Sequence, residues 1–367
     1  MSMFNDFSEL EVREETIPET SDLEKVLDIE DEILNEKWDI HFNHLDEEQK
    51  EDVFYSELYK NCKKRLEGVS LSSDLLQLYL DSRENTDDTV TGFERGYFSA
   101  ILLELYCLQN PKKPLFLDGR NKIFHELFSH ARYVSNLTLR NVYGEGILSR
   151  AGIHGKIENV FIENIIGNFL LYEAGMSGGQ IKNILVKTVK GNSTLEYAAT
   201  GGTGENITVM DIQGDRTLIS LGKNSGRVQF VQAINIQGNF TLSFAGSEKG
   251  EVNYVTLANS RGMNLLNGVK EVTPNHFEGR YLPPVNKLIL RDMLKDQIVC
   301  TSINPDKFEM YGKIFTQKDG FEEYEHITID RQRIVDDILT FATSEESEKD
   351  IHELERLYGE LFKETFL

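Results

Sequence analysis

Hydrophobic and polar positions repeat through residues 134–272. Six glycines mark the repeat at successive spacings of 23, 24, 23, 24 and 24 residues, namely Gly144, Gly167, Gly191, Gly214, Gly238 and Gly262. A leucine follows each glycine by four residues, at Leu148, Leu171, Leu195, Leu218, Leu242 and Leu266. A branched aliphatic precedes each glycine by seven, at Leu137, Val160, Ile184, Ile207, Val231 and Val255. A short polar residue precedes each glycine by three, at Asn141, Asn164, Thr188, Asp211, Asn235 and Asn259.

This period indicates one coil of a solenoid per repeat, because paired-helix repeats need roughly 33 residues or more. Aliphatic residues alternate before each glycine, as Val160, Ile162 and Ile165 do, which is typical of a strand with one buried face. Asn or Asp follows four of the six glycines, so the pair predicts a sharp corner. We expect a second short strand to carry the leucine, with two to three strands closing each coil.

Stacked coils pair as parallel strands about 4.8 Å apart, and crossovers between parallel strands are almost always right-handed. The sequence therefore predicts a right-handed parallel β-helix of about six coils. Identical residues then lie over one another, so the leucines form an interior column. The polar residues three positions before the glycines form a side-chain ladder.

These glycine corners and stacked aliphatics resemble the right-handed parallel β-helix, or pectin-lyase-like, superfamily over residues 134–272. The resemblance implies architecture, and this architecture carries many unrelated functions. Hydrolases of this fold use clustered aspartates as acid and base on the outer face of the strands, and lyases use acidic calcium ligands. The two aspartates of the repeat, Asp211 and Asp215, fit structural positions in the ladder and at a corner.

Four regions follow from the pattern: an acidic tail over 1–20, a helical region over 21–133, the β-helix, and a mostly helical region over 273–367 with a hairpin near 313–329. Apolar residues cover nearly the whole circumference of the helix predicted over 91–109. We expect this helix to plug the open end of the β-helix, which would otherwise expose unpaired backbone.

Two further segments flank the repeat. Residues 115–118 with Gly119 are expected to form an incomplete first coil, because Gly119 precedes Gly144 by 25 residues. Beyond the prolines that follow the repeat, residues 285–298 are predicted to form a helix, and further helices are expected over 330–341 and 347–366.

The chain carries a net charge of −22, distributed as −15 over 1–133, +1 over 134–272 and −8 over 273–367. Direct binding to nucleic acid or to anionic membrane needs clustered positive charge, so neither is expected. Three scattered cysteines argue against a disulfide framework. With no signal-peptide pattern and no long apolar segment, we expect a cytoplasmic protein.

Two surfaces of the β-helix are candidate binding sites. Tyr172, Glu173 and Tyr197 fall on neighbouring coils, where aromatics beside a carboxylate could hold a sugar or a peptide, although packing is the default interpretation. A second strip consists of apolar residues at positions expected to point outward from the strands, namely Phe161, Leu185, Met210 and Ile234. Either the flanking helices or a partner should cover it.

Other combinations have structural explanations. Arg140, Glu163 and Lys187 recur at one offset on successive coils, which fits a surface ion ladder better than a catalytic triad. The pairs His41 with His44, near Asp46, and His125 with His130 lack a third ligand at a known spacing for zinc. No catalytic residue, metal or cofactor is therefore predicted.

The favoured hypothesis is a non-enzymatic scaffold that binds a protein partner or a second copy of itself. A carbohydrate-binding or carbohydrate-cleaving β-helix is the alternative. A second alternative is an acidic mimic of nucleic acid, which the placement of the charge on the flanks disfavours.

Overall fold

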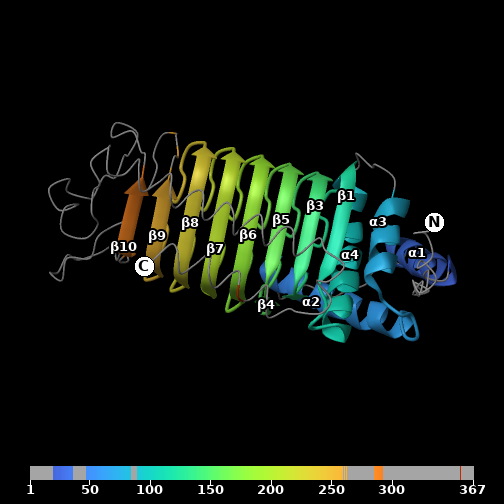
Figure 1. The fold of residues 1–367 in the computed structure, drawn as a ribbon. Helices are drawn as coiled ribbons and strands as arrows, with labels where there is room; N and C mark the ends of the chain where they lie inside the picture. The colour runs from blue at the N-terminus through green and yellow to red at the C-terminus, as the bar shows by residue number, and fades with distance from the viewer. Residues whose placement is uncertain are drawn as a thin grey trace, which may run out of the picture.

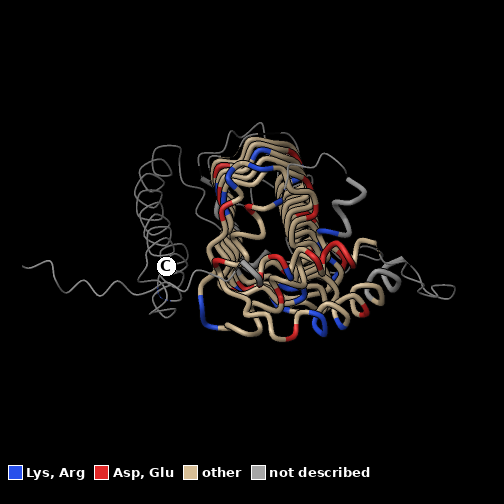
Figure 2. The backbone as a smooth tube through the Cα atoms, turned by 90° about the vertical axis from the view of Figure 1, so that its right-hand side faces the viewer, with Lys and Arg blue, Asp and Glu red and all other residues tan. Residues whose placement is uncertain are grey.

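A computed structural model describes residues 20–35, 47–83, 89–258, 260, 262, 285–291 and 356 of the chain. Parallel strands lie side by side as a twisted ladder, and four helices gather at its amino-terminal end (Figure 1). Viewed down the long axis, successive coils superpose (Figure 2). The fold is the predicted right-handed parallel β-solenoid with helical flanks.

The helices occupy the predicted amino-terminal region. They are α1 (Thr20–Asn35), α2 (Glu47–Arg65), α3 (Ser73–Ser82) and α4 (Thr89–Gln109). The Ser72 side chain caps α3 by accepting the Leu75 N–H at 3.1 Å. Among the helices that the structure describes, none has the length and apolar composition needed to cross a membrane.

One long sheet contributes a strand from every coil, in the order β1-β3-β5-β6-β7-β8-β9-β10. Its strands are β1 (Leu115–Ile123), β3 (Leu137–Tyr143), β5 (Val160–Ile166), β6 (Gln180–Lys190), β7 (Thr203–Gln213), β8 (Arg227–Gln237), β9 (Glu251–Ala258) and β10 (Val285–Arg291). Two short strands, β2 (Tyr133–Val134) and β4 (Lys156–Ile157), continue the same stack.

The repeating glycines lie where one coil closes onto the next. A Cβ atom added at Gly167 would lie 1.6 Å from the carbonyl oxygen of Gly144, and one added at Gly191 would lie 1.8 Å from that of Gly167. Real Cβ atoms never approach so closely, so close stacking explains the repeat of glycine better than the turn angle we had expected. The residue after the glycine holds the same corner, since Asn168 Oδ1 accepts the Asn192 N–H at 2.8 Å.

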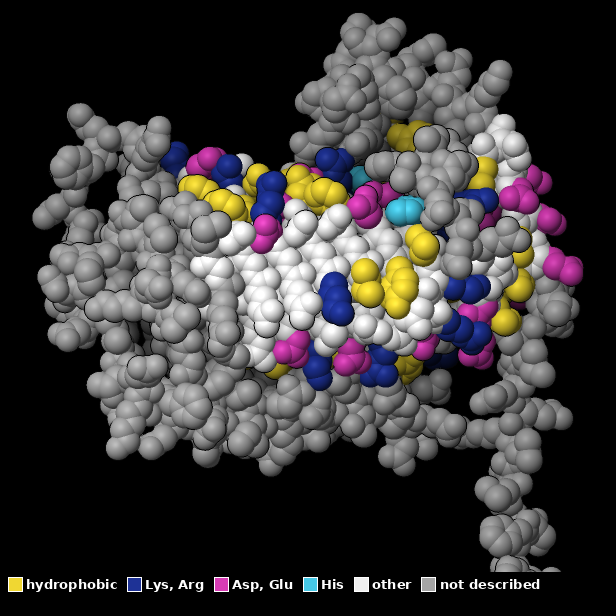
Figure 3. Space-filling view, turned by 90° about the horizontal axis from the view of Figure 1, so that it is seen from above, with side chains coloured by type: hydrophobic (Ala, Val, Ile, Leu, Met, Phe, Trp, Pro, Cys, Tyr) yellow, Lys and Arg dark blue, Asp and Glu magenta, His cyan; other side chains and the backbone are white. Residues whose placement is uncertain are grey.

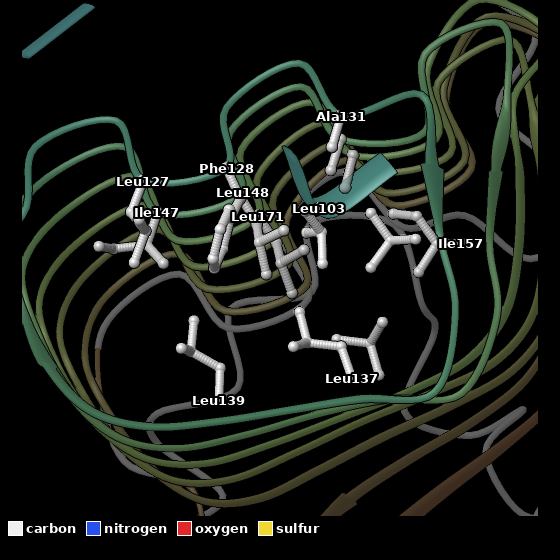
Figure 4. Packing of buried hydrophobic residues seen from close by; sticks show 14 of the residues in the cluster. Leu103, Leu127, Phe128, Ala131, Leu137, Leu139, Ile147, Leu148, Ile157 and Leu171 are labelled. Carbon is white, nitrogen blue, oxygen red and sulfur yellow. The ribbon is translucent and has the colours of Figure 1, made fainter. Parts of the chain in front are cut away.

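The leucines lie in the predicted interior column, but the segment that carries them is not a strand. After each glycine from Gly144 to Gly238 the chain follows consecutive turns in which alternate residues have positive φ, for example Phe169 (62°), Leu171 (52°) and Glu173 (57°). Pairs of side chains consequently point alternately into and out of the solenoid, and the chain outlines square projections (Figure 4). The expected second strand is therefore wrong, because bulky residues were not expected to adopt positive φ.

The core runs through the solenoid and into its helical cap. The repeated leucines from Leu148 to Leu242 are at most 1 % exposed, whereas Leu266 lies outside the described residues. In Figure 4, Leu148 and Leu171 project toward the sheet residues Leu137 and Leu139, and Leu103 of α4 lies among them. One continuous apolar cluster thus joins the helices to the coils.

Helix α4 covers the open end of the solenoid, as predicted, and its side chains also pair with the exposed backbone. Three of them accept N–H groups of the first coil, namely Ser99 Oγ from Phe128 at 3.0 Å, Glu104 Oε2 from Arg132 at 2.9 Å, and Cys107 Sγ from Ser135 at 3.4 Å. On the sheet side, Gln77 of α3 both accepts from the Asp118 N–H at 2.8 Å and donates to the Asp118 carbonyl at 2.9 Å. The cap therefore supplies hydrogen-bond partners that a preceding coil would otherwise provide to the first coil.

Asparagine side chains form the expected ladder and a second one. In the expected ladder, Asn164 Nδ2 donates to Asn141 Oδ1 at 2.6 Å, and Asn235 Nδ2 donates to Asp211 Oδ1 at 2.8 Å. The second ladder lies eight residues before the glycines and was not foreseen. It joins Asn206 to Asn183 at 2.7 Å, Asn183 to Asn159 at 2.7 Å, and Asn159 to Asn136 at 2.8 Å.

Two expectations at the ends of the solenoid are corrected. Strand β1 does form a first coil, but Gly144 stacks on Phe124 rather than on Gly119. Residues 285–291, predicted as the start of a helix, form β10 and pair in parallel with β9, so the sheet extends beyond residue 272. The predicted tail over 1–20 apart from Thr20, the hairpin near 313–329 and the helix over 330–341 lie outside the described residues. Of the helix predicted over 347–366, the structure describes only Arg356, which is helical and exposed.

The corner glycines provide a test of close stacking. Gly191→Ala should lower the free energy of unfolding by more than about 3 kcal/mol, because its Cβ would overlap backbone that cannot move aside. Gly201→Ala is the control. It adds a Cβ with no atom nearer than 3.7 Å and should cost about 1 kcal/mol for its positive φ. Urea denaturation of both variants measures the difference, and similar losses would contradict the stacking argument.

The unforeseen ladder provides a second test. Asn183→Ala removes one donor and one acceptor, leaving groups of Asn159 and Asn206 unsatisfied, and should destabilise the protein by about 2 kcal/mol or more. Gln213→Ala, an exposed position on β7, should change stability by less than about 0.5 kcal/mol. Thermal denaturation compares the two, and equal melting temperatures would show that the ladder contributes little.

Candidate functional site

The predicted residues Tyr172, Glu173 and Tyr197 lie on the turn segments that follow β5 and β6. Their coils stack directly, because the Glu173 N–H donates to the Glu196 carbonyl at 2.8 Å. The rings of Tyr172 and Tyr197 make an edge-to-face contact with centroids 5.8 Å apart. Phe169 extends the group through a similar contact to Tyr172 at 5.5 Å. The structure thus brings the two tyrosines together, half-buried, beside an exposed phenylalanine.

Backbone hydrogen bonds place further aromatics in the same two columns of outward-pointing side chains. Residues two positions after each glycine stack, which puts Phe240 in the column of Phe169, and residues six positions after stack, which puts Phe244 in the column of Tyr197. We call Phe169, Tyr172, Tyr197, Phe240 and Phe244 the aromatic ridge. Its phenylalanines are 37–43 % exposed. In a view onto the arrowhead ends of the strands, hydrophobic, basic and acidic side chains alternate along one border of the solenoid (Figure 3).

Charged side chains of the same coils pair with one another along the ridge. Glu173 Oε2 binds Arg150 Nε at 2.7 Å, and Glu196 pairs with Arg216. The Lys223 ammonium lies 6.0 Å from the centre of the Tyr197 ring and 3.1 Å from a carboxylate oxygen of Glu248. Each of these carboxylates is therefore neutralised by a cation of the chain itself.

Burial and the neighbouring carboxylates fix the state of the Tyr172 hydroxyl. Desolvation raises the pKa of Tyr172 well above its ordinary value, and the charge of Glu173 raises it further. The phenol consequently stays protonated near neutral pH, where it donates a hydrogen bond. That hydrogen bond goes to Glu173, so this arrangement offers ring edges and ring faces to a ligand. It does not offer the pair of free carboxylates that glycoside hydrolysis uses.

The second predicted strip is buried. Phe161, Leu185, Met210 and Ile234 are each at most 2 % exposed. The register places Phe161 beside Leu185 on adjacent strands, and Met210 beside Ile234 in the next column. These side chains are therefore not accessible to an added ligand in this structure.

The charged residues that sequence analysis assigned to structural roles have those roles in the structure. Arg140 and Glu163 approach to 3.3 Å, and Lys187 lies 4.0 Å from Glu163, which forms the expected ion ladder along one face. Asp215 Oδ1 accepts the N–H of Asn239 at the corner. Among the described residues, no group of three or more His, Cys, Asp or Glu side chains could hold a metal ion. His41, His44 and Asp46 lie outside the described residues.

Sequence reasoning missed Phe169 and Phe240, whereas the offsets of five and six from the glycines place Glu196 and Phe244 with Tyr172 and Tyr197 but do not predict that Glu196 is buried. The signal for Phe169 and Phe240 was present at a constant offset of two from the glycines. That offset was expected to belong to a second strand, in which side chains point to the two faces one by one. In the structure they point in and out of the solenoid in pairs. The Glu196 side chain is 1 % exposed, and no periodic pattern marks its burial.

Comparison with protein-family models, curated proteins and solved structures found no match for this chain. The fold and the ridge together define its class: a parallel β-solenoid closed at one end by helices, with exposed phenylalanines and half-buried tyrosines on its turns.

The buried carboxylate of Glu196 makes the charge pairs testable. Arg216→Ala should destabilise the protein by about 3 kcal/mol, because it leaves a buried charge without a cation. The double variant Arg216→Ala with Glu196→Gln should recover most of that loss, since the amide carries no charge. Denaturant titration of both variants measures the recovery, and a double variant as unstable as Arg216→Ala would contradict this account.

Proposed function

We propose that this protein is a non-enzymatic scaffold that binds a protein partner through the aromatic ridge. The observation that carries the proposal is the conformation of the ridge residues. Phe169, Tyr197, Phe240 and Phe244 all have φ between 57° and 62°. Bulky side chains are unfavourable in this region by roughly 1 kcal/mol or more each, and Asn or Gly would fit better.

Exposure makes the same residues costly for a second reason. Phe169, Phe240 and Phe244 leave large apolar surfaces in water, and aligned exposed apolar groups mark binding surfaces more often than scattered ones do. Edge-to-face contacts with Tyr172 stabilise Phe169 and Tyr197 in part, but the exposed parts of the phenylalanine rings add nothing to that stability. Aromatic residues are enriched where protein surfaces bind one another, so a protein partner is the favoured ligand.

The net charge of −22 bears on the kind of partner. Two copies of the chain repel one another at long range, whereas a basic protein is attracted and meets the ridge more often. Self-association is consequently the weaker form of the proposal. A carbohydrate ligand, which also stacks on aromatic rings, remains the alternative to test.

Paired variants test the role of the ridge. Phe169→Ser with Phe244→Ser should reduce recovery of the specific partner from a native-host extract at least tenfold. Leu108→Ser is the control, because Leu108 is a 50 % exposed apolar residue on the cap, and it should retain the partner. Quantitative affinity purification with mass spectrometry, followed by binding of the purified partner, measures both.

Two results would contradict the proposal. If the ridge variant retains every partner that the wild type binds, the ridge is not the binding surface. If the wild type instead binds immobilised oligosaccharides and the ridge variant does not, the carbohydrate alternative replaces the scaffold.

A further inference from the structure

Glu126 lies at the junction of the helical cap and the first two coils. A Cβ atom added at Gly96 of α4 would lie 2.4 Å from the Glu126 carbonyl oxygen, and one added at Gly146 would lie 2.3 Å from the Glu126 carboxyl group. The Glu126 N–H donates to the Glu145 carbonyl at 2.7 Å. The residue is therefore held between one glycine of the cap and one glycine of the second coil.

The groups that face this carboxyl come from all three elements. Tyr97 faces it from α4, Glu145 from the second coil, and Ser129 from its own turn, where the Ser129 side chain hydrogen-bonds to it. The neighbouring His130 ring packs on Tyr97 with centroids 4.7 Å apart, and its Nδ1 lies 2.8 Å from Ser129 Oγ. The groups identified around the carboxyl are thus two hydroxyl groups and a second carboxylate, with the His130 ring next to Tyr97 and Ser129.

Burial of this kind disfavours the charged form of an acid. The pKa of Glu126 is raised to about 7, mainly by desolvation; the hydrogen bond from Ser129 lowers it in part, and the charge of Glu145 contributes to the rise. The protonated carboxyl is neutral and fits the closed junction. Glu126 is partly buried, and its ionised carboxylate would be better hydrated if α4 moved away from the first coil near Gly96.

We propose that the Glu126 carboxyl group is a proton-operated latch that fastens the helical cap to the solenoid. The closed junction binds the proton more tightly than the open one, so closure is most stable at acidic pH and weakens as pH rises from about 4.5 to about 7. Opening uncovers backbone N–H groups that the cap otherwise satisfies, including those of Phe128 and Arg132. Such groups form an edge that can pair with another chain.

Hydrogen–deuterium exchange of the full chain tests the latch. Protection factors for the amides of residues 96–107, corrected for intrinsic exchange rates, should fall roughly tenfold between pH 6 and pH 8. The control Glu126→Gln should show no such fall, because its amide does not titrate. Glu145→Gln keeps an oxygen to accept from Asn168 Nδ2 but removes a repelling charge, so its transition should move to lower pH.

Equal protection at both pH values in the wild type would overturn the proposal. So would an undiminished pH dependence in Glu126→Gln, which would assign the effect to another group such as His130. If Glu126→Gln does not fold, carbon-13 NMR titration of Glu126 in the wild type decides the question. A midpoint near 7 supports the latch, and one near the ordinary value of 4.5 overturns it.

Discussion

The close approach of successive coils at the glycine corner is the constraint on which this structure depends. The carbonyl oxygen of each corner lies where the next coil would place a Cβ atom, at 1.6–1.9 Å from that position along the whole column. Because the corners are in register, the strand before each corner and the turns after it are in register too, and the one-residue difference between repeats of 23 and 24 residues falls later in the coil. Leucine therefore falls on leucine, asparagine on asparagine, and Glu163 between two cations. A single steric requirement thus turns a linear repeat into columns with distinct chemistry.

A stack of coils has ends, and the amino-terminal end shows how a helix can close one. A helix has no free backbone to offer along its side, so α4 uses side-chain acceptors. Ser99, Glu104 and Cys107 meet N–H groups that a preceding coil would have satisfied. Glu104 is itself held by the buried Tyr55 hydroxyl at 2.9 Å. Such a closure is specific, because each acceptor must meet one donor.

The sequence predicted the architecture where a constraint repeats along the chain. It did not predict features that occur only once. Six copies of the glycine and leucine offsets predicted the solenoid, its core column and one polar ladder. The second ladder, through Asn183, had the same spacing and could have been found. The segment 285–291 was wrongly predicted as a helix, because its aliphatic pattern fits a helix and a buried strand equally well. The contacts of Gln77 and Glu104 join unrelated stretches of sequence and leave no periodic trace.

The columns of side chains differ in what determines their residue types, and this difference bears on function. Inward columns are fixed by packing, as the leucines are, and the Asx columns are fixed by hydrogen bonds between coils. Outward columns on the turns need only tolerate positive φ, and their residues vary from glycine to arginine. At such positions the fold favours small or polar residues. Aromatic residues at Phe169 and Phe240 run against that preference, and the proposed binding surface rests on this departure from what the fold favours.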